Sequence, residues 1–567
     1  MSAGFRSKVW QLARFSLLTA GIAGSALFPS LGVQAAAVSG PASAAPHTRT
    51  GLLTPAGTID PIHPPAGGAA LAAAPKTKTR AKGIQRLSAQ LAGAATAGKP
   101  SVNAGGLDAS PAGGLQQNFN GVGSLDSAVT NFGLEFEPPD QGLCVGNGVV
   151  LEPVNSAYTF YHRDGSLIAG PFNVNDLFGD PGLAFTTDPR CVYDQAANRW
   201  FAIIAFISDD NTVGRVEIAV STTGDPTGLW TVYRLDATDD GSNGTPAHRG
   251  CPCFGDQPLL GIDSQNLYIS TNEFAIIGPQ ANGAQIYAIT KAELVAASSA
   301  HFVMFENLSL GGSTAFSVQP ALTYSSTGAE FFLNSLDPNG HGDNRLGVWA
   351  LTNPQAVAQG GVPNLSSLVI ASEAYSIPPG APQQGATSLL DAGDDRMQQT
   401  EFINGELWGE LDTAVGLRHD ASLRAGIAWF RVHPALAGQT LGSASIAGQG
   451  YLAAAGNSLL YPAIAAGADG LAAMVFTITG PNQFASAAYA VMSNDHSAFG
   501  EIHIAANGTG PYDPNAGRWG DYSWAAPDPS GHGLWFATEY IPPAASQTTD
   551  GRRNWGTRVF EVNAGGN

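Results

Sequence analysis

Residues 254–270 read FGDQPLLGIDSQNLYIS, and this stretch carries the pattern that decides the fold. A small polar triplet precedes a short apolar run, a turn follows, and a second β-rich run ends the unit. Residues 186–203, TTDPRCVYDQAANRWFAI, and residues 318–333, VQPALTYSSTGAEFFL, follow the same order. Apolar runs separated by Gly, Pro, Asn and Asp are typical of β-hairpins. The sequence therefore predicts one kind of hairpin that recurs along the chain.

Aligned on its polar triplet, this unit occurs seven times. Self-similar units that each hold several short strands are the signature of a β-propeller. We therefore predict an all-β fold, a β-propeller of seven four-stranded blades, with a β-sandwich as the competing architecture. The triplets are Asp140-Gln141-Gly142, Thr187-Asp188-Pro189, Asp256-Gln257-Pro258, Val318-Gln319-Pro320, Gln398-Gln399-Thr400, Leu460-Tyr461-Pro462 and Asp521-Tyr522-Ser523.

The two ends of the repeat predict how the propeller closes. The last unit contains the runs YSWAAP (522–527), GLWFATEY (533–540) and WGTRVFEVN (555–563), one strand short of a four-stranded blade. The segment LQQNFNGV (115–122) lies just before the first unit. We expect it to supply the missing strand, which removes an exposed sheet edge.

The N-terminus is typical of a secretory signal peptide, which we place over residues 1–36. Arg6, Lys8 and Arg14 precede an apolar stretch, and small residues follow it at a cleavage point. No later apolar run is long enough to span a bilayer. We therefore predict a secreted or periplasmic protein, and we expect a monomer.

The mature chain divides into a leader and the propeller. Residues 37–115 are rich in Ala, Gly and Pro and hold few large apolar residues. Such a segment buries too little surface to offset its ordering entropy, so we predict a disordered leader or pro-segment. The propeller is expected over residues 116–567.

Charge and cysteine content limit the partners. The net charge is −19, and the acids fall almost entirely after the basic first 100 residues. An acidic surface repels phosphate backbones, so nucleic acid is excluded as a partner. The four cysteines favour disulfides in an oxidising compartment, with a zinc site as the rival interpretation; the pairing stays open. They are Cys144, Cys191, Cys251 and Cys253.

Equivalent triplet positions should form rings at one mouth of the central channel. The middle positions are all polar and are the candidate ligand-binding residues: Gln141, Asp188, Gln257, Gln319, Gln399, Tyr461 and Tyr522. Carboxylates and amide carbonyls are the oxygen ligands that calcium takes, which makes calcium the candidate cofactor. The candidate metal ligands are Asp140, Asp188, Asp256 and Asp521.

Three interpretations of this ring remain open. Its groups can be structural and bond neighbouring blades, as buried polar groups must. They can hold a cation, or two carboxylates can act as acid and base in glycoside hydrolysis. Because Gln cannot transfer protons in that way, the ring favours binding over chemistry.

Several motifs together carry a family resemblance. PPDQG (138–142), DPRCVYDQAANRW (188–200), AVSTTGDPTGLW (219–230) and RWGDYSWAAPDP (518–529) resemble a largely uncharacterised family of exported bacterial β-propeller proteins. The resemblance spans about 116–567 and implies the fold and export, but no activity. The chain is also loosely similar to sialidase-like propellers, in which three arginines bind the carboxylate of the substrate. Arg190, Arg396 and Arg518 are the candidates here.

These observations favour an extracellular binding or interaction module for polysaccharide or a cell-surface partner. The alternative is a glycoside hydrolase of sialidase-like design with its site at the channel mouth. A purely structural envelope component is a third possibility, so the sequence alone leaves open whether the protein is an enzyme.

Overall fold

The computed structural model describes twelve stretches of the chain, all of which lie within residues 37–567. The predicted signal peptide therefore lies outside the described residues. The described stretches are 46–64, 101–102, 107–108, 114–134, 136–323, 327–417, 420, 422–493, 495–512, 518–531, 533–547 and 553–563.

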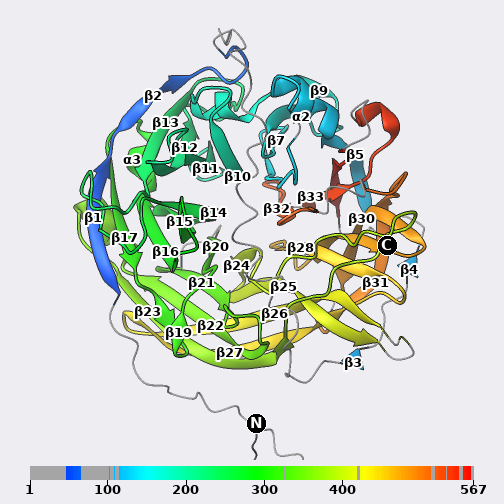
Figure 1. The fold of residues 1–567 in the computed structure, drawn as a ribbon. Helices are drawn as coiled ribbons and strands as arrows, with labels where there is room; N and C mark the ends of the chain where they lie inside the picture. The colour runs from blue at the N-terminus through cyan, green and yellow to red at the C-terminus, as the bar shows by residue number, and fades with distance from the viewer. Residues whose placement is uncertain are drawn as a thin grey trace, which may run out of the picture. The chain divides into compact units, whose positions relative to one another are not determined.

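The described residues form mostly β-strands, which confirms the predicted all-β class. Consecutive strands pair antiparallel in groups of four, and each group runs outward from its first strand (Figure 1). The first three groups are β6 (Cys144–Gly146), β7 (Val149–Pro153), β8 (Ala157–His162) and β9 (Leu167–Asn173); β10 (Phe185–Asp194), β11 (Arg199–Ile207), β12 (Gly214–Ser221) and β13 (Trp230–Asp236); and β14 (Cys253–Ile262), β15 (Asn266–Ala275), β16 (Ala281–Thr290) and β17 (Ala300–Glu306).

The remaining groups follow the same plan. They are β20 (Gln319–Thr323), β21 (Ala329–Ser335), β22 (Asp343–Thr352) and β23 (Asn364–Tyr375); β24 (Thr400–Ile403), β25 (Glu406–Leu417), β26 (Leu423–Ala437) and β27 (Thr440–Leu452); and β28 (Ser458–Ala466), β29 (Ala472–Gly480), β30 (Gln483–Met492) and β31 (Phe499–Ala506). A short hairpin, β18 (Ser309–Leu310) and β19 (Ser313–Thr314), precedes β20.

The described helices are short and lie between strands. They are α2 (Ser124–Thr130), α3 (Lys291–Val295) and the 3-10 turns η1 (Val174–Phe178), η2 (Pro354–Gln359) and η3 (Ala544–Ser546). Among the described residues, no helix has the length and hydropathy needed to cross a bilayer.

Neighbouring groups meet through their first strands. β20 runs parallel to β14, where Ile262 pairs with Leu322, and to β24, where Ala321 pairs with Thr400. In Figure 1 the first strands lie toward the middle of this unit, and fourth strands such as β17 and β27 lie at its rim. The arrangement is propeller-like, so residues at equivalent positions of the first strands approach one another.

The sequence predicts that each polar triplet stands at the start of a strand, but the structure does not place all of them there. In β10, β14 and β28 the triplet lies inside the strand at a register shift, which is a β-bulge. The bulged residues Asp188, Gln257 and Tyr461 have left-handed backbones, with φ of 61°, 46° and 51°. A bulge re-aims the backbone and side chain of one residue, so the triplets mark places where the inner strand turns toward its neighbour.

The predicted pairing of residues 115–122 with the last group is confirmed. The last group contains β32 (Trp524–Pro527), β33 (Leu534–Tyr540) and β34 (Gly556–Val562), and β5 (Leu115–Gly123) pairs antiparallel with β34. The segment ahead of the first group therefore completes the last one and covers its edge.

The segment predicted as a disordered leader contains strands. β1 (His47–Leu53) pairs with β17, and β2 (Pro55–Ile59) pairs with β13. β3 (Ser101–Val102) and β4 (Leu107–Asp108) pair with β25 and β31. The expectation is wrong for these residues. The outer strands β17, β13 and β31 offer unpaired backbone groups to β1, β2 and β4, which have little apolar surface to bury.

The cysteines form two disulfides, which confirms the predicted use of cysteine. Cys144 of β6 is bonded to Cys191 of β10, and Cys251 to Cys253. The first bond joins the inner strands of adjacent groups.

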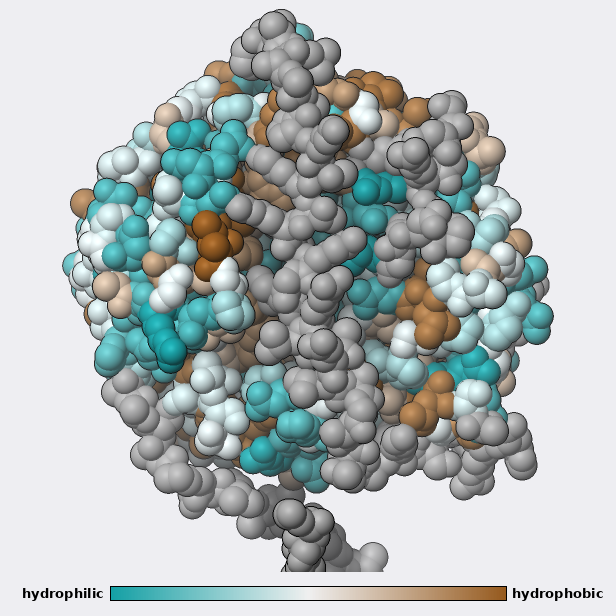
Figure 2. Space-filling model, in the orientation of Figure 1, coloured by the Kyte–Doolittle hydropathy of each residue, from teal (hydrophilic) through white to brown (hydrophobic). Residues whose placement is uncertain are grey.

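On the face in Figure 2, hydrophilic residues are interspersed with smaller hydrophobic areas.

The closing strand is expected to contribute measurably to stability. Phe119 of β5 packs on Tyr161 with ring centroids 5.3 Å apart, so Phe119→Ala should lower the free energy of unfolding by about 2 kcal/mol or more. Leu167→Ala on β9, where the side chain is 58% exposed, is the matched control and should change it by less than about 0.5 kcal/mol. Urea unfolding measures both, and equal effects would contradict the role of β5.

Candidate functional site

Three of the four predicted metal-ligating carboxylates come together. Asp140, Asp188 and Asp521 each offer an oxygen within 4.8 Å of the other two. Asp256, the fourth, is half-buried beside them. Burial, followed by the charge of Asp188, raises the pKa of Asp256 to about 7.

Hydrogen bonds connect these residues across adjacent groups of strands. Asp140 Oδ1 accepts from the Asp521 amide at 2.8 Å, and Asp140 Oδ2 accepts from Asn155 Nδ2 at 2.7 Å. Asn155 Oδ1 in turn accepts from the Asp188 amide at 2.7 Å, and Asp188 Oδ2 from the Gln257 amide at 3.2 Å. One continuous network therefore joins the last group to the first three.

The same kind of bond recurs at other junctions. The Ser317 amide donates to Asn272 Oδ1 of β15 at 2.8 Å, and the Tyr461 amide donates to Asp412 Oδ1 of β25 at 3.0 Å. Ser317, like the bulged residues, has a left-handed backbone, with φ of 44°. A left-handed residue ahead of or within an inner strand thus turns its N–H toward a side chain of the adjacent group.

The electrostatics of the carboxylates follow from burial. Burial raises the pKa of Asp140 well above its usual range, and the charges of Asp521 and Asp188 raise it further. Burial, followed by the charge of Asp521, likewise raises the pKa of Asp188. Carboxyl groups this close do not all ionise at once: either one of them keeps a proton, or a cation lies among them.

Two arginines complete what we call the carboxylate–arginine cluster. Arg518 Nη2 lies 2.7 Å from Asp521 Oδ2, and Arg396 bonds both carboxylate oxygens of Asp394 at 2.6 Å. Arg396 also donates to Gln257 Oε1. Arg518 and Arg396 side chains are 15% and 17% exposed, so solvent reaches this part of the cluster. The cluster comprises Asp140, Asp188, Asp256, Asp394, Arg396, Arg518 and Asp521.

Most of the predicted ring of middle positions is engaged in bonds between groups. Gln141 Nε2 donates to the Tyr522 carbonyl at 2.8 Å, and the Tyr522 hydroxyl donates to the Pro189 carbonyl at 2.9 Å. Gln399 bonds both the N–H and the C=O of Ala525 in β32.

Three other ring positions, Gln319, Tyr461 and Gln257, are likewise 0–4% exposed. Gln319 donates only to the next carbonyl along the chain. The ring therefore links inner strands, and the partly exposed atoms belong to the carboxylate–arginine cluster.

The three arginines considered for a sialidase differ in their surroundings. Arg190 is buried with its guanidinium 3.9 Å from the Tyr522 ring centroid and 5.0 Å from that of Trp524. Burial lowers the pKa of Arg190. Arg396 and Arg518 already pair with carboxylates, so this arrangement presents no set of three arginines open to a ligand carboxylate.

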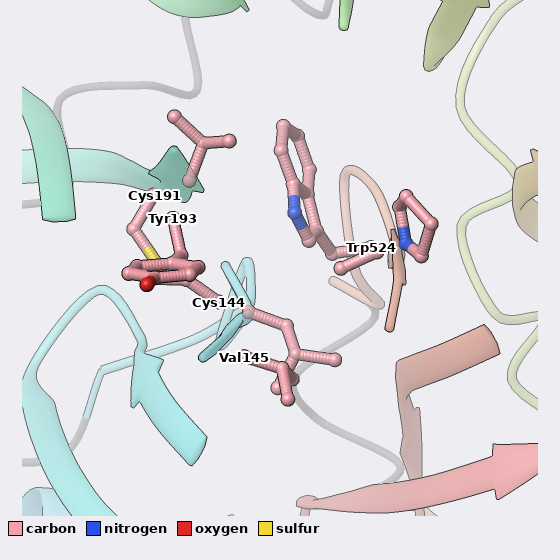
Figure 3. A pocket seen from close by; sticks show the side chains of 9 residues that line it. Cys144, Val145, Cys191, Tyr193 and Trp524 are labelled. Carbon is pink, nitrogen blue, oxygen red and sulfur yellow. A yellow bond between two sulfur atoms is a disulfide. The ribbon is translucent and has the colours of Figure 1, made fainter. Parts of the chain in front are cut away.

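A small hollow lies along the inner strands β6, β10 and β32 (Figure 3). Its lining includes the Cys144–Cys191 disulfide, Tyr193 and Trp524. Its volume of about 10 Å³ matches roughly one water molecule and no larger ligand.

Asn155 and Asp412 accept hydrogen bonds from backbone N–H groups of adjacent groups of strands. The sequence pattern does not identify either residue. Asn155 lies in the turn between β7 and β8, and Asp412 lies within β25. Neither stands at a repeated triplet position, so the alignment of units carries no signal for them.

No protein-family model matches the chain, and no curated protein matches it. Among solved structures, the endosialidase of phage phi92 matches 76% of this chain and 67% of its own, with 10% identity and a TM-score of 0.36. Trypanosoma rangeli sialidase matches 74% and 59%, with 10% identity and a TM-score of 0.33. The α-L-arabinofuranosidase of Fusarium graminearum matches 78% and 97%, with 10% identity and a TM-score of 0.29. TM-scores this low carry no inference about substrate or activity.

Stability should depend on pH through Asp256. Its pKa is about 7 in the folded chain against 3.8 for a free side chain, so the folded state holds the extra proton between these values. The stability from this proton is present at low pH and is lost as pH rises through 7. The change in melting temperature caused by Asp256→Asn should therefore be more favourable at pH 8 than at pH 5.

Asp495→Asn is the matched control for this measurement. Asp495 is exposed, and hydrogen bonds from Ser493 and Ser497 lower its pKa to about 2, so it is ionised in both states from pH 5 to 8. Its effect on melting temperature should be the same at both pH values. An effect of Asp256→Asn that is the same at both pH values would contradict the inference that Asp256 holds a proton in the folded chain.

Proposed function

We propose that this protein is an exported seven-bladed β-propeller that binds neutral carbohydrate at the carboxylate–arginine cluster. The observation that carries the proposal is the pairing of partly exposed arginines with carboxylates, Arg518 with Asp521 and Arg396 with Asp394. Each pair offers donors and acceptors side by side. Sugar hydroxyls both donate and accept, so they match such pairs.

The sign of the charge favours a neutral sugar over an acidic one. The cluster holds five carboxyl groups and two guanidinium groups, and burial raises the pKa values of Asp140, Asp188 and Asp256. With protons on these three groups, the carboxylates of Asp394 and Asp521 balance the two guanidinium groups, so the cluster has no net positive charge to attract an anionic sugar. Calcium remains the proposed cofactor for the three carboxylates Asp140, Asp188 and Asp521, whose oxygens are of the type it takes.

The blade count is part of the same proposal. Groups of four antiparallel strands beginning at β6, β10, β14, β20, β24 and β28 are each counted as a blade, and β32–β34 with β5 as the last. In this fold the ends of inner strands surround one channel mouth, where ligand sites gather.

Glycoside hydrolysis at the same cluster is the second candidate. Asp256, with a pKa of about 7, is suited to donate a proton, and Asp521 lies close enough to influence it. Turnover would therefore require Asp256, whereas binding would depend mainly on the arginines.

Binding of the full chain to neutral and sialylated oligosaccharides, with calcium and with a chelator, tests the proposal. We expect the parent to prefer neutral sugars, and we expect Arg518→Gln to weaken binding about tenfold or more through loss of a charged hydrogen-bonding group. Arg345→Gln, which breaks the Arg345–Asp343 ion pair elsewhere, is the matched control and should bind like the parent.

Three outcomes would contradict parts of this account. A folded parent that binds none of the sugars, or binds sialylated ones better, would overturn the carbohydrate proposal. Equal binding by the two arginine variants would remove the cluster as the site. Product release by the parent that Asp256→Asn abolishes would establish the hydrolase instead.

A further inference from the structure

A second cluster of charged side chains lies at one edge of the sheet formed by β14–β17. Asp239 and His248 belong to the loop that follows β13, Glu273 lies on β15, and Glu306 ends β17. The three acids are 0%, 1% and 7% exposed. None of these residues belongs to the carboxylate–arginine cluster.

The imidazole of His248 lies at the centre of this second cluster. His248 Nδ1 is 2.9 Å from Glu273 Oε1 and 3.9 Å from Asp239 Oδ2, and His248 Nε2 is 3.1 Å from Glu306 Oε2. One ligand atom each from Asp239, His248 and Glu273 lies within 4.8 Å of the other two. The ring thus directs one nitrogen at two carboxylates and the other at a third.

A carboxylate oxygen of the cluster lacks a hydrogen-bond donor. Asp239 Oδ1 is buried without a hydrogen-bond partner, although Gln285 Nε2 donates to Asp239 Oδ2 at 2.6 Å. Arg49 of β1 donates to the Gly244 carbonyl. A buried carboxylate oxygen without a donor is costly, and a cation held between the carboxylates would remove that cost.

We propose that Asp239, His248 and Glu273 bind one divalent transition-metal ion of the zinc class. Imidazole and carboxylate are ligands that zinc takes, whereas an imidazole ligand disfavours calcium and magnesium. His248 Nδ1 would be the ligand atom, and a small rotation of the ring would let Nε2–H donate to Glu306 Oε2, which lies 3.1 Å away. Metal-bound histidines commonly donate their other N–H to a carboxylate, which fixes the tautomer and orients the ring.

The neighbouring cysteines give the proposal a clear alternative. Cys251 Sγ lies 3.4 Å from Glu273 Oε1, and the ligand atoms of Cys251, Cys253 and Glu273 also lie within 4.8 Å of one another. While Cys251 and Cys253 are joined in a disulfide, neither sulfur is a thiolate, so the proposed site does not use them.

Equilibrium dialysis of zinc against the untagged full chain, without reductant, tests the site. We expect one zinc ion per chain, and we expect Glu273→Gln and His248→Ala each to weaken binding about tenfold or more. Glu293→Gln is the matched control, because Glu293 forms a simple pair of one carboxylate and one histidine with His301 at 2.9 Å. Its affinity should equal that of the parent, and circular dichroism verifies that each variant is folded.

Cobalt substitution identifies the ligand atoms. Cobalt in a nitrogen and oxygen site should show weak visible bands without an intense sulfur-to-metal charge-transfer band. Absence of stoichiometric zinc binding, or unchanged affinity in folded Glu273→Gln and His248→Ala, would overturn the proposal. Zinc binding that occurs only after a phosphine reductant opens the disulfide, with the charge-transfer band, would also overturn it and assign the metal to the cysteines.

Discussion

The junctions between groups of strands depend on backbone amides that several inner strands present to side chains of an adjacent group. Asp188, Gln257 and Tyr461 adopt left-handed backbones, which cost a non-glycine residue about 1 kcal/mol or more. Their N–H groups donate to side chains of the neighbouring group, and an ordinary hydrogen bond contributes about 0.5–1.5 kcal/mol. The bond therefore offsets the strain, and together they fix the angle at which one group meets the next.

The same constraint explains why acidic groups gather where the inner strands approach one another. The acceptors for these amides include Asp140, Asp188 and Asp412, each buried with its pKa raised by that burial. Residues that join the groups are thus also the residues that can hold a proton or a cation. Fold and candidate site are consequently built from one set of side chains, with Arg396 and Arg518 at its partly exposed side.

The sequence predicted the strands, and the pairing of β5 with the last group, because hairpins leave a local pattern of apolar runs and turns. It also placed Asp140, Asp188 and Asp521 together, since equivalent positions of a repeat become neighbours. Asn155 and His248 could not be predicted, because each meets its partners only through contacts between distant segments. β1 was missed for a different reason: the sequence HTRTGLL has little apolar surface, and the strand forms by pairing with the edge of β17.

Native-state hydrogen exchange at the bulged amides tests most directly whether they hold adjacent groups together. Mass spectrometry of peptides that contain Asp188, Gln257 and Tyr461 follows these amides in the full chain. These amides are expected to exchange only when the whole fold opens, as strongly bonded core amides do. Exchange as fast as in the exposed loop 208–213 would contradict this expectation, because the amides would then be free of their side-chain acceptors for much of the time.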